Sequence, residues 1–371
     1  MGIAKRIAKQ NTQIGRHLMP LVYFDHGAIA GSLGGMTFQS VTVEITQRCN
    51  LNCVYCYNYW KNPRFSSKDE PHSHNYHKKL LGRILRTVDT EHIVFSGGEP
   101  FTLEHLLDLC LFVRMKGKRV SIVSNGTNED AALYTKLLDL GVRSYMLPLH
   151  SGNPAIHDRM TRTPGSWHRS LSSMQTIISL GGRVSAAIVI TSLNYAEIGK
   201  TIKLLQSIGV RRVMLDRITL AGEALNNPEI IPSKFELTEA FAAADSAANY
   251  YKADVRSNIC TPACIVDPLH FPNIRFPLCP NAGTVVSPLI DWQGDIRACT
   301  VSPTVIGNIF RDEVDSVLNS DYFRKWKEPP ALCTRCDRFA ECSAGCRAAA
   351  EHIGLGPENP DPVIGTMIEG A

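Results

Sequence analysis

Between residues 40 and about 220, short apolar runs alternate with segments that have the periodicity of amphipathic helices. The apolar runs cover residues 41–45, 92–96, 119–124, 143–149, 183–190 and 211–218. The intervening segment 195–209 repeats apolar residues at helical spacing and ends at Gly209, a common helix stop. Strands alternating with helices favour a parallel sheet with the helices outside it. The sequence therefore predicts an α/β fold, a partial (β/α)6 barrel whose functional residues gather at the carboxyl ends of the strands.

The cysteines are distributed unevenly along the chain. Of twelve cysteines in 371 residues, three lie at 49–56, one is Cys110 and eight follow residue 259. In a reducing cytosol, clustered cysteines bind metals or carry redox chemistry more often than they form disulfides. Cys110 falls in an apolar helical segment, so we expect it in the core. The other two groups predict metal binding after the first strand and again in the tail.

The overall composition limits the classes of partner. The chain carries 39 basic and 35 acidic residues, a balance that does not favour nucleic acid. No long apolar segment follows the mildly basic start, which predicts neither a signal peptide nor a membrane span. Arg6 stands where a myristoylation signal needs Ser or Thr. We expect a cytoplasmic protein with no nucleic-acid or membrane partner.

The first group of cysteines directly follows the first predicted strand. In "TQRCNLNCVYCYN", Cys49, Cys53 and Cys56 have the spacing C-x3-C-x2-C. A structural zinc site closes around the metal with four protein ligands. Three thiolates on a four-iron cluster would instead leave one iron open to a group from outside the protein. The spacing alone allows both a zinc knuckle and such a cluster.

Two further motifs lie at the ends of the second and third predicted strands. "SGGEP", residues 96–100, has two glycines that permit close backbone approach, beside an acidic side chain suited to an ammonium group. "SNGT", residues 124–127, offers short polar side chains that can hydrogen-bond to a ribose. Either motif alone is common at strand ends. Their order after the three cysteines makes the combination specific.

Together these motifs resemble those of the radical S-adenosylmethionine (radical SAM) enzymes over residues 40 to 220. The resemblance implies that Cys49, Cys53 and Cys56 hold a [4Fe–4S] cluster whose fourth iron binds the methionine end of SAM. It also implies an adenine contact by the aromatic residue before the third cysteine, methionine contacts by the glycine motif and ribose contacts by the third motif. The implied SAM-binding residues are Tyr55, Gly97, Gly98, Glu99, Pro100, Ser124 and Asn125.

The tail resembles the SPASM domain, a C-terminal extension of radical SAM enzymes that binds auxiliary [4Fe–4S] clusters. Cys279, Gly294 and Cys299 precede a C-x2-C-x5-C-x3-C run. The resemblance implies an outer cluster on the first three cysteines of that run, and an inner cluster on its last cysteine together with cysteines from upstream. The outer set would be Cys333, Cys336 and Cys342, and the inner set Cys279, Cys299 and Cys346, completed by Cys260 or Cys264.

One departure from this pattern affects the outer cluster. The family normally supplies a last cysteine, commonly after an Asp-Pro pair, but Val363 stands there and no cysteine follows Cys346. The outer cluster would have an open iron or a different ligand, for which Glu351 and His352 are nearby in sequence, or it would be absent. Structural zinc in place of the tail clusters is the alternative.

Several other residues invite a functional or a structural interpretation. The segment 71–79 is polar, and we predict a surface loop carrying His72, His74 and His77. Residues at the ends of the fourth and sixth strands would face SAM or substrate, or else serve the structure: His150, Asp216 and Arg217. Arg159 and Arg162 lie near a segment in which the family often has a SAM-contacting arginine, but neither aligns cleanly. The end of the chain, from residue 355, is predicted to be extended or frayed.

We predict three regions: an extension at 1–39, a radical SAM partial barrel at 40–255 and a cysteine-rich SPASM-like domain at 256–371. The expected cofactors are the SAM-binding cluster and one or two auxiliary [4Fe–4S] clusters, with a flavodoxin- or ferredoxin-type protein as reductant. Auxiliary clusters favour net oxidation of the substrate. We expect modification of a ribosomally made peptide, although residues 1–39 are too few for a leader-recognition module. The alternatives are radical chemistry on a sugar, aminocyclitol or tetrapyrrole, and an iron–sulfur electron carrier without catalysis.

Overall fold

The computed structural model describes residues 38, 40–62, 73–282 and 288–368. Six strands pair in parallel, each with the next along the chain. They are β1 (Val41–Glu44), β2 (His92–Ser96), β3 (Arg119–Val123), β4 (Ser144–Pro148), β5 (Arg183–Ile190) and β6 (Arg212–Arg217). The predicted parallel α/β sheet is confirmed, and each strand lies within or close to its predicted run.

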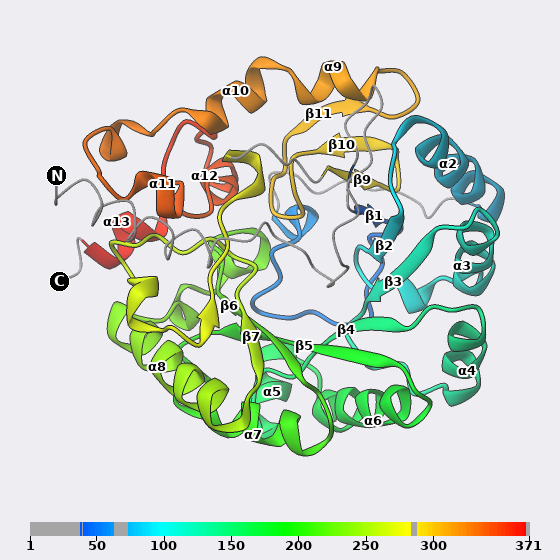
Figure 1. The fold of residues 1–371 in the computed structure, drawn as a ribbon, viewed down its shortest axis with the longest axis horizontal. Helices are drawn as coiled ribbons and strands as arrows, with labels where there is room; N and C mark the ends of the chain where they lie inside the picture. The colour runs from blue at the N-terminus through cyan, green and yellow to red at the C-terminus, as the bar shows by residue number, and fades with distance from the viewer. Residues whose placement is uncertain (1–37, 39, 63–72, 283–287, 369–371) are drawn as a thin grey trace, which may run out of the picture.

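Helices cover the outer, convex side of this curved sheet (Figure 1). α2, for example, buries the apolar side chains of Leu80 and Ile84 on one face. The helix after β6 begins with a capping box, in which the side chains of Ser233 and Glu236 each bond to the other's backbone. The helices are α2 (His74–Thr87), α3 (Leu106–Met115), α4 (Ala131–Asp139), α5 (Pro154–Thr161), α6 (Ser166–Ser179), α7 (Ile198–Ser207) and α8 (Lys234–Tyr251).

The sheet continues beyond the six predicted strands at both edges. In the part of the chain that the structure describes, eleven strands run in the order β11-β10-β9-β1-β2-β3-β4-β5-β6-β7-β8. β9 pairs in parallel with β1, and β10 and β11 add antiparallel strands beyond it. The additional strands are β7 (Asp254–Arg256), β8 (Ile274–Arg275), β9 (Leu289–Asp291), β10 (Asp295–Arg297) and β11 (Val305–Asn308). The tail therefore extends the barrel's own sheet.

Short helices follow the last strand and lie beside the open side of the barrel (Figure 1). They are α9 (Val314–Leu318), α10 (Asp321–Lys327), α11 (Phe339–Cys342), α12 (Ala348–His352) and α13 (Val363–Ile368). The prediction of an extended or frayed end is wrong for α13. Its apolar side chains Val363, Ile364 and Met367 are buried in the main core, and burial on one face stabilises even a short helix.

The predicted histidine loop is also wrong where the structure describes it. Ser73 caps α2 by accepting a hydrogen bond from the Tyr76 amide, so the helix begins at His74 and includes His77. His77 is only 1% exposed, and its Nδ1 lies 2.8 Å from Nε2 of His105, the residue that precedes α3. His72 lies outside the described residues, as does the N-terminal extension apart from Phe38. Cys110 is fully buried in α3, as predicted.

Within the described ranges, no helix combines the length and apolar character needed to cross a membrane.

Candidate functional site

The cysteine loop after β1 is held against the glycine motif after β2 by backbone contacts. The Gly98 amide donates to the Thr46 carbonyl at 2.7 Å, and the Glu99 amide donates to the Arg48 carbonyl at 2.6 Å. Asn58 closes the other end of the loop, with its side-chain amide donating to the Gly97 carbonyl at 3.2 Å. Because β1 and β2 are paired in parallel, both motifs emerge at the same edge of the sheet.

The two glycines are required by this close approach. A Cβ on Gly97 would lie 2.3 Å from the Thr46 carbonyl oxygen, and one on Gly98 would lie 2.1 Å from that of Arg48. Gly97 also has φ of +130°, a conformation that side chains disfavour. The sequence-based expectation of close backbone approach at these glycines agrees with the geometry.

Glu99 is buried, with 2% of its surface exposed, and points toward the third motif. Its Oε1 accepts hydrogen bonds from the Phe101 amide and the Ser124 hydroxyl, at 3.0 and 2.9 Å. Its Oε2 accepts from the Asn125 amide at 2.6 Å. Burial raises the pKa of this carboxyl to about 7 despite these donors. A cationic ligand group beside Glu99 would offset that cost.

The third motif also reaches the cysteine loop directly. The Asn125 side-chain amide donates to Asn50 at 2.6 Å and lies 3.9 Å from the Cys49 sulfur. Asn50 in turn donates to the Thr127 hydroxyl at 2.9 Å. The structure thus brings the three motifs into one network of contacts. Asn50 was missed from the sequence because asparagine in a loop carries no distinctive signal.

Burial raises the pKa of all three thiols in the cysteine loop. The values for Cys53 and Cys56 are about 12 and about 11, so without metal both are protonated at neutral pH. Metal binding displaces these protons. The donor set of three thiols from one loop fits a [4Fe–4S] cluster with an open iron. Among the described residues, this loop included, no three Cys, His, Asp or Glu side chains converge closely enough to hold a single metal ion.

Tyr55 joins this loop to the end of β4. Its hydroxyl interacts with the Cys53 sulfur and lies 2.5 Å from Nε2 of His150. Nδ1 of His150 accepts a hydrogen bond from the Val189 amide at 3.1 Å, so Nε2 carries the proton and donates to Tyr55. Burial lowers the pKa of His150 well below its usual range. His150 is therefore a neutral support for the cluster loop.

Asp216 and Arg217, at the end of β6, hold the segment that leads to Cys260. Asp216 accepts a hydrogen bond from the Ile259 amide at 3.2 Å, and the Arg217 guanidinium donates to the Cys260 carbonyl at 2.8 Å. Arg217 also forms a fully buried ion pair with Asp361. Asp361 accepts a further hydrogen bond from the Cys346 amide at 2.7 Å. These contacts are structural ones that link the barrel to the tail cysteines.

Arg162, at the end of α5, pairs with Glu223 at 2.7 Å, and the Glu223 amide donates to the Cys56 carbonyl at 2.8 Å. The neighbouring Gly222 contacts both the cysteine loop and α12. A Cβ on Gly222 would lie 2.4 Å from the Cys56 carbonyl oxygen, and the Gly222 amide donates to Nδ1 of His352 at 3.2 Å. Because Nε2 of His352 bonds to the Val301 carbonyl at 2.7 Å, both ring nitrogens are engaged.

Glu351, the other residue considered for the outer cluster, is also engaged elsewhere. It accepts hydrogen bonds from the hydroxyls of Ser302, Thr304 and Tyr322 at 2.5–3.0 Å. This network lies beside Cys299, since Glu351 contributes to the raised pKa of that thiol, after burial and other groups. Neither Glu351 nor His352 is therefore available to the outer cysteines.

Four tail thiols interact with one another at the end of β6. The Cys260 thiol donates to Cys279, which lowers the pKa of Cys279 and raises that of Cys260. Cys346 also affects Cys260 electrostatically, and Cys279 affects both Cys299 and Cys346. Of the two alternatives for completing the inner set, Cys260 is the one that interacts with Cys279 and Cys346. Cys264 interacts with a different group of thiols.

Two family models match this chain. The radical SAM superfamily model matches residues 43–205, and the model of the SPASM iron–sulfur cluster-binding domain matches residues 283–337. The chain is a radical SAM enzyme with a SPASM domain. Its cofactors are a [4Fe–4S] cluster that binds SAM and auxiliary [4Fe–4S] clusters in the tail. Membership of this family favours catalysis over the alternative of an iron–sulfur electron carrier.

Curated relatives cover most of this radical SAM enzyme at low identity. An AdoMet-dependent heme synthase of Methanosarcina barkeri is 22% identical over 83% of this chain and 90% of its own length. A PqqA peptide cyclase of Ruegeria pomeroyi is 22% identical, covering 87% and 86%. The mycofactocin maturase MftC of Mycolicibacterium smegmatis is 23% identical, covering 87% and 81%.

Solved structures share the fold. Streptococcus suis SuiB bound to its precursor peptide SuiA superposes with a TM-score of 0.65 at 13% identity, covering 97% of this chain and 88% of its own. The native enzyme anSMEcpe with AdoMet and a peptide gives 0.62 at 14% identity, covering 83% and 89%. These likenesses confirm the partial-barrel fold.

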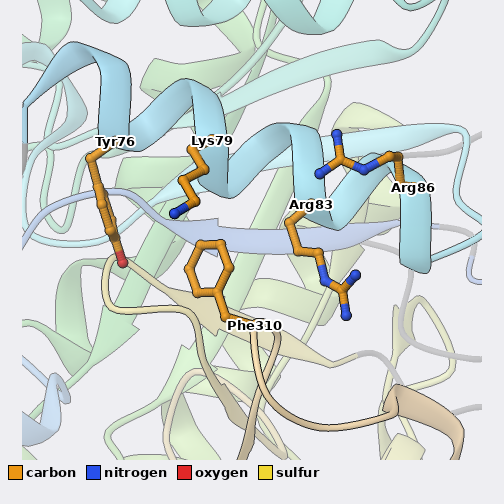
Figure 2. A pocket seen from close by; sticks show the side chains of 5 residues that line it. All are labelled: Tyr76, Lys79, Arg83, Arg86 and Phe310. Carbon is orange, nitrogen blue, oxygen red and sulfur yellow. The ribbon is translucent and has the colours of Figure 1, made fainter.

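A basic groove lies outside the barrel, away from the motif network (Figure 2). It has a volume of about 440 Å³ and lies between α2 and the turn after β11. In Figure 2, Lys79 points from the helix toward the ring of Phe310, and its Nζ lies 5.7 Å from the ring centre. None of the lining residues belongs to the radical SAM or cysteine motifs: Tyr76, Lys79, Arg83, Arg86 and Phe310.

Proposed function

We propose that this enzyme binds SAM at Cys49, Cys53 and Cys56 and oxidises a substrate by radical chemistry. The cluster that these cysteines would hold supplies, when bound and reduced, an electron for cleavage of SAM to methionine and a 5′-deoxyadenosyl radical, and that radical would abstract a hydrogen atom from the substrate. The observation that carries this proposal is the contact network that joins the three motifs. It brings the Glu99 carboxylate and the Asn125 amide to the edge of the loop that carries the three thiols.

The chain's own residues would orient SAM and exclude water. Glu99 would accept a hydrogen bond from the SAM ammonium group, with Gly97, Gly98 and Pro100 forming the wall beside it. The backbone and side chains of Ser124 and Asn125 would contact the ribose, and the Tyr55 ring would lie by the adenine. The donors already aimed at Glu99 fix its position before the ligand arrives, so little reorganisation is needed on binding.

The auxiliary clusters support an oxidative outcome. The eight cysteines after residue 259 lie in a part of the chain tied to the barrel at β6, and clusters held there would accept the electron that a substrate radical loses. We propose dehydrogenation or crosslinking, with a flavodoxin- or ferredoxin-type protein as the external reductant. All twelve thiols are free, which suits a reducing compartment such as the cytoplasm.

A ribosomally made peptide is the substrate class that the comparisons support most often. The PqqA peptide cyclase is named for a peptide substrate, and SuiB is described with its precursor peptide. A small molecule is the second candidate, because a relative that covers 83% of this chain is an AdoMet-dependent heme synthase. Because the name of this relative refers to heme, a tetrapyrrole is the small-molecule substrate that we would test.

The radical step can be tested with anaerobically reconstituted, reduced protein, by chromatography of SAM cleavage products. Wild type is expected to form 5′-deoxyadenosine, and Cys53→Ala to form none. Cys110→Ala is the matched control, because it removes a thiol that is buried in α3, outside the cysteine loop and the tail. Undiminished product from Cys53→Ala would refute the assignment.

The substrate class needs a separate experiment. The neighbouring genes are inspected for a short precursor-like reading frame, and the enzyme is co-expressed with the encoded peptide. Loss of hydrogen from the peptide, measured by mass spectrometry and absent with Cys53→Ala, would support peptide modification. An unmodified peptide, together with conversion of a tetrapyrrole by the purified enzyme, would favour the small-molecule alternative.

A further inference from the structure

The residue at the family's usual last ligand position has another role in this chain. Val363 is 1% exposed and packs with Ile364 in the main core at the start of α13. A valine side chain offers iron no donor atom. The Asp-Pro pair before it serves the inner set, because Asp361 accepts from the Cys346 amide and pairs with Arg217. The fourth ligand of the outer cluster must therefore come from elsewhere in the chain, if the cluster is complete.

The segment around Cys264 contacts the chain that carries Cys336 and Cys342, and it does so both before and after Cys264. Three residues after Cys264, Asp267 forms a two-pronged ion pair with Arg338, at 2.7 and 2.9 Å. Arg338 lies between Cys336 and Cys342 in the chain. Such a planar pair fixes orientation as well as distance, because both guanidinium donors are used.

On the other side of Cys264, Pro262 packs against Gly345. A Cβ on Gly345 would lie 2.6 Å from Cγ of Pro262, so only glycine allows this approach. The Cys264 carbonyl also accepts a hydrogen bond from Lys234 on α8, at 3.2 Å. Cys264 is thus held from both flanks against the segment 338–345.

The thiols of this region lie close enough to interact electrostatically. The Cys264 thiol lies within electrostatic range of the Cys342 and Cys336 thiols. The Cys333 thiol lies within the same range of Cys342, Cys336 and Cys264. Cys260, four residues before Cys264, interacts instead with Cys279 and Cys346. The two neighbouring cysteines therefore belong to different groups.

We propose that Cys264 is the fourth thiolate of the outer auxiliary cluster, in place of the cysteine that Val363 replaces. The eight tail cysteines then divide into two complete sets. The outer set is Cys264, Cys333, Cys336 and Cys342, and the inner set is Cys260, Cys279, Cys299 and Cys346.

A complete outer set has a chemical consequence. With four thiolates, no iron of that cluster is open to water or substrate, so its role is limited to electron transfer. Cys264 and Cys336 are exposed at the surface, which suits exchange of electrons with an external protein. This inference rests on the auxiliary-cluster part of the proposed function and is independent of the substrate class.

The test measures iron, sulfide and zinc content with Mössbauer spectra on full-length, anaerobically reconstituted protein. Three complete clusters give about 12 irons per chain, and Cys264→Ala should lose about four of them or show one iron with a non-sulfur ligand. Cys264→Ser should retain the cluster in part, because an alkoxide is a poorer ligand. Cys110→Ala should match wild type. SAM cleavage by dithionite-reduced Cys264→Ala should persist, since the first cluster is untouched.

Contrary results are distinguishable from failure of the radical step. If Cys264→Ala keeps the full iron content and an unchanged spectrum, Cys264 is not a ligand. If wild type holds zinc on these thiols, the outer cluster itself is absent. If Cys264→Ala loses the inner-cluster signal that Cys260→Ala also loses, Cys264 belongs to the inner set. Each of these outcomes overturns the proposal, whether or not the protein cleaves SAM.

Discussion

The loop after β1 and the tail gather their cysteines in different ways. The loop carries three thiols within eight residues, and main-chain bonds to the glycine motif fix its path. The tail collects eight thiols from residues 260 to 346 and depends on arginine side chains that bridge distant segments. A local motif can be recognised from spacing, whereas an assembly of distant segments cannot. Substitutions in the loop and in the tail should therefore have different effects on cluster content and stability.

The largest expected effect comes from adding one methyl group beside the loop. In Gly98→Ala, the new Cβ would lie 2.1 Å from the Arg48 carbonyl oxygen, which only movement of the backbone can relieve. We expect loss of the SAM-binding cluster and of SAM cleavage, while the tail clusters persist. Iron analysis and product chromatography measure this.

The matched control is Gly199→Ala, whose Cβ would lie 3.7 Å or more from its neighbours on a helix. Equal SAM cleavage by Gly98→Ala and Gly199→Ala would show that the glycine contact is dispensable.

The second effect concerns the buried ion pair that serves the tail. Asp361→Ala would leave the Arg217 guanidinium buried without its partner, which typically costs about 3–5 kcal/mol of unfolding free energy. The inner cluster should lose iron first, because the Cys346 amide loses its acceptor. Denaturant unfolding under anaerobic conditions and iron analysis measure both changes.

Lys200→Ala, which removes the exposed pair with Glu197, is the control and should change unfolding by about 0–1 kcal/mol. If Asp361→Ala is no more harmful than this control, the tail does not depend on the buried pair.

A third effect is a pH dependence of SAM binding. The Glu99 pKa is raised to about 7 in the SAM-free protein, and only the ionised carboxylate attracts the SAM ammonium group. Affinity should therefore increase as pH rises through 7. Loss of one charge-assisted hydrogen bond corresponds to about 1.5–3 kcal/mol, or roughly 10- to 100-fold in Kd.

Titration of SAM into wild type and Glu99→Gln between pH 6 and 8 tests this expectation. The variant should bind more weakly at pH 8 and show a flat profile. A wild-type profile as flat as that of the variant would remove Glu99 from the ammonium site.

The smallest effect is expected at Tyr55. Tyr55→Phe keeps the ring but removes the hydroxyl that accepts from His150 at 2.5 Å, a change of about 1 kcal/mol in stability. SAM cleavage should persist at nearly the wild-type rate, with the cluster assembled. Thermal unfolding and absorbance of the reconstituted cluster measure the two properties. Failure to assemble the cluster would mean that the hydroxyl is essential to the loop.

The strands of the barrel could be predicted because their apolar runs are long and regularly spaced. β2 covers the predicted 92–96 in full, and the parallel order followed from the helices between strands. The strands β7 to β11 have two to four residues each, too few to carry a periodic signal, and are formed only by pairing with existing edges. The helix α13 was missed because nearby prolines suggest an extended chain, while burial of its apolar face decides the outcome.

The candidate site was also predictable only in part. The proximity of the three motifs followed from their places at neighbouring strand ends. The proposed place of Cys264 in the outer set could not be foreseen, because the sequence offers Cys260 and Cys264, four residues apart, as equal alternatives for the inner set. The salt bridge between Asp267 and Arg338 joins positions about 70 residues apart, and no local pattern marks such a pair.

The pairing of β1 with β9 imposes an order of events on biosynthesis. Thr42 lies opposite Leu289, so the partner strand of β1 is made about 250 residues later. At translation rates of roughly 5–20 residues per second, that edge waits about 10–50 s for its partner. During this interval a nascent chain already displays the thiols of the first loop, which are open to oxidation, next to an unpaired edge of β1 that could pair with other chains. The yield of intact enzyme in a cell should therefore depend on the translation rate between the codons of β1 and β9. It should also depend on the oxygen concentration to which the nascent chain is exposed during that time.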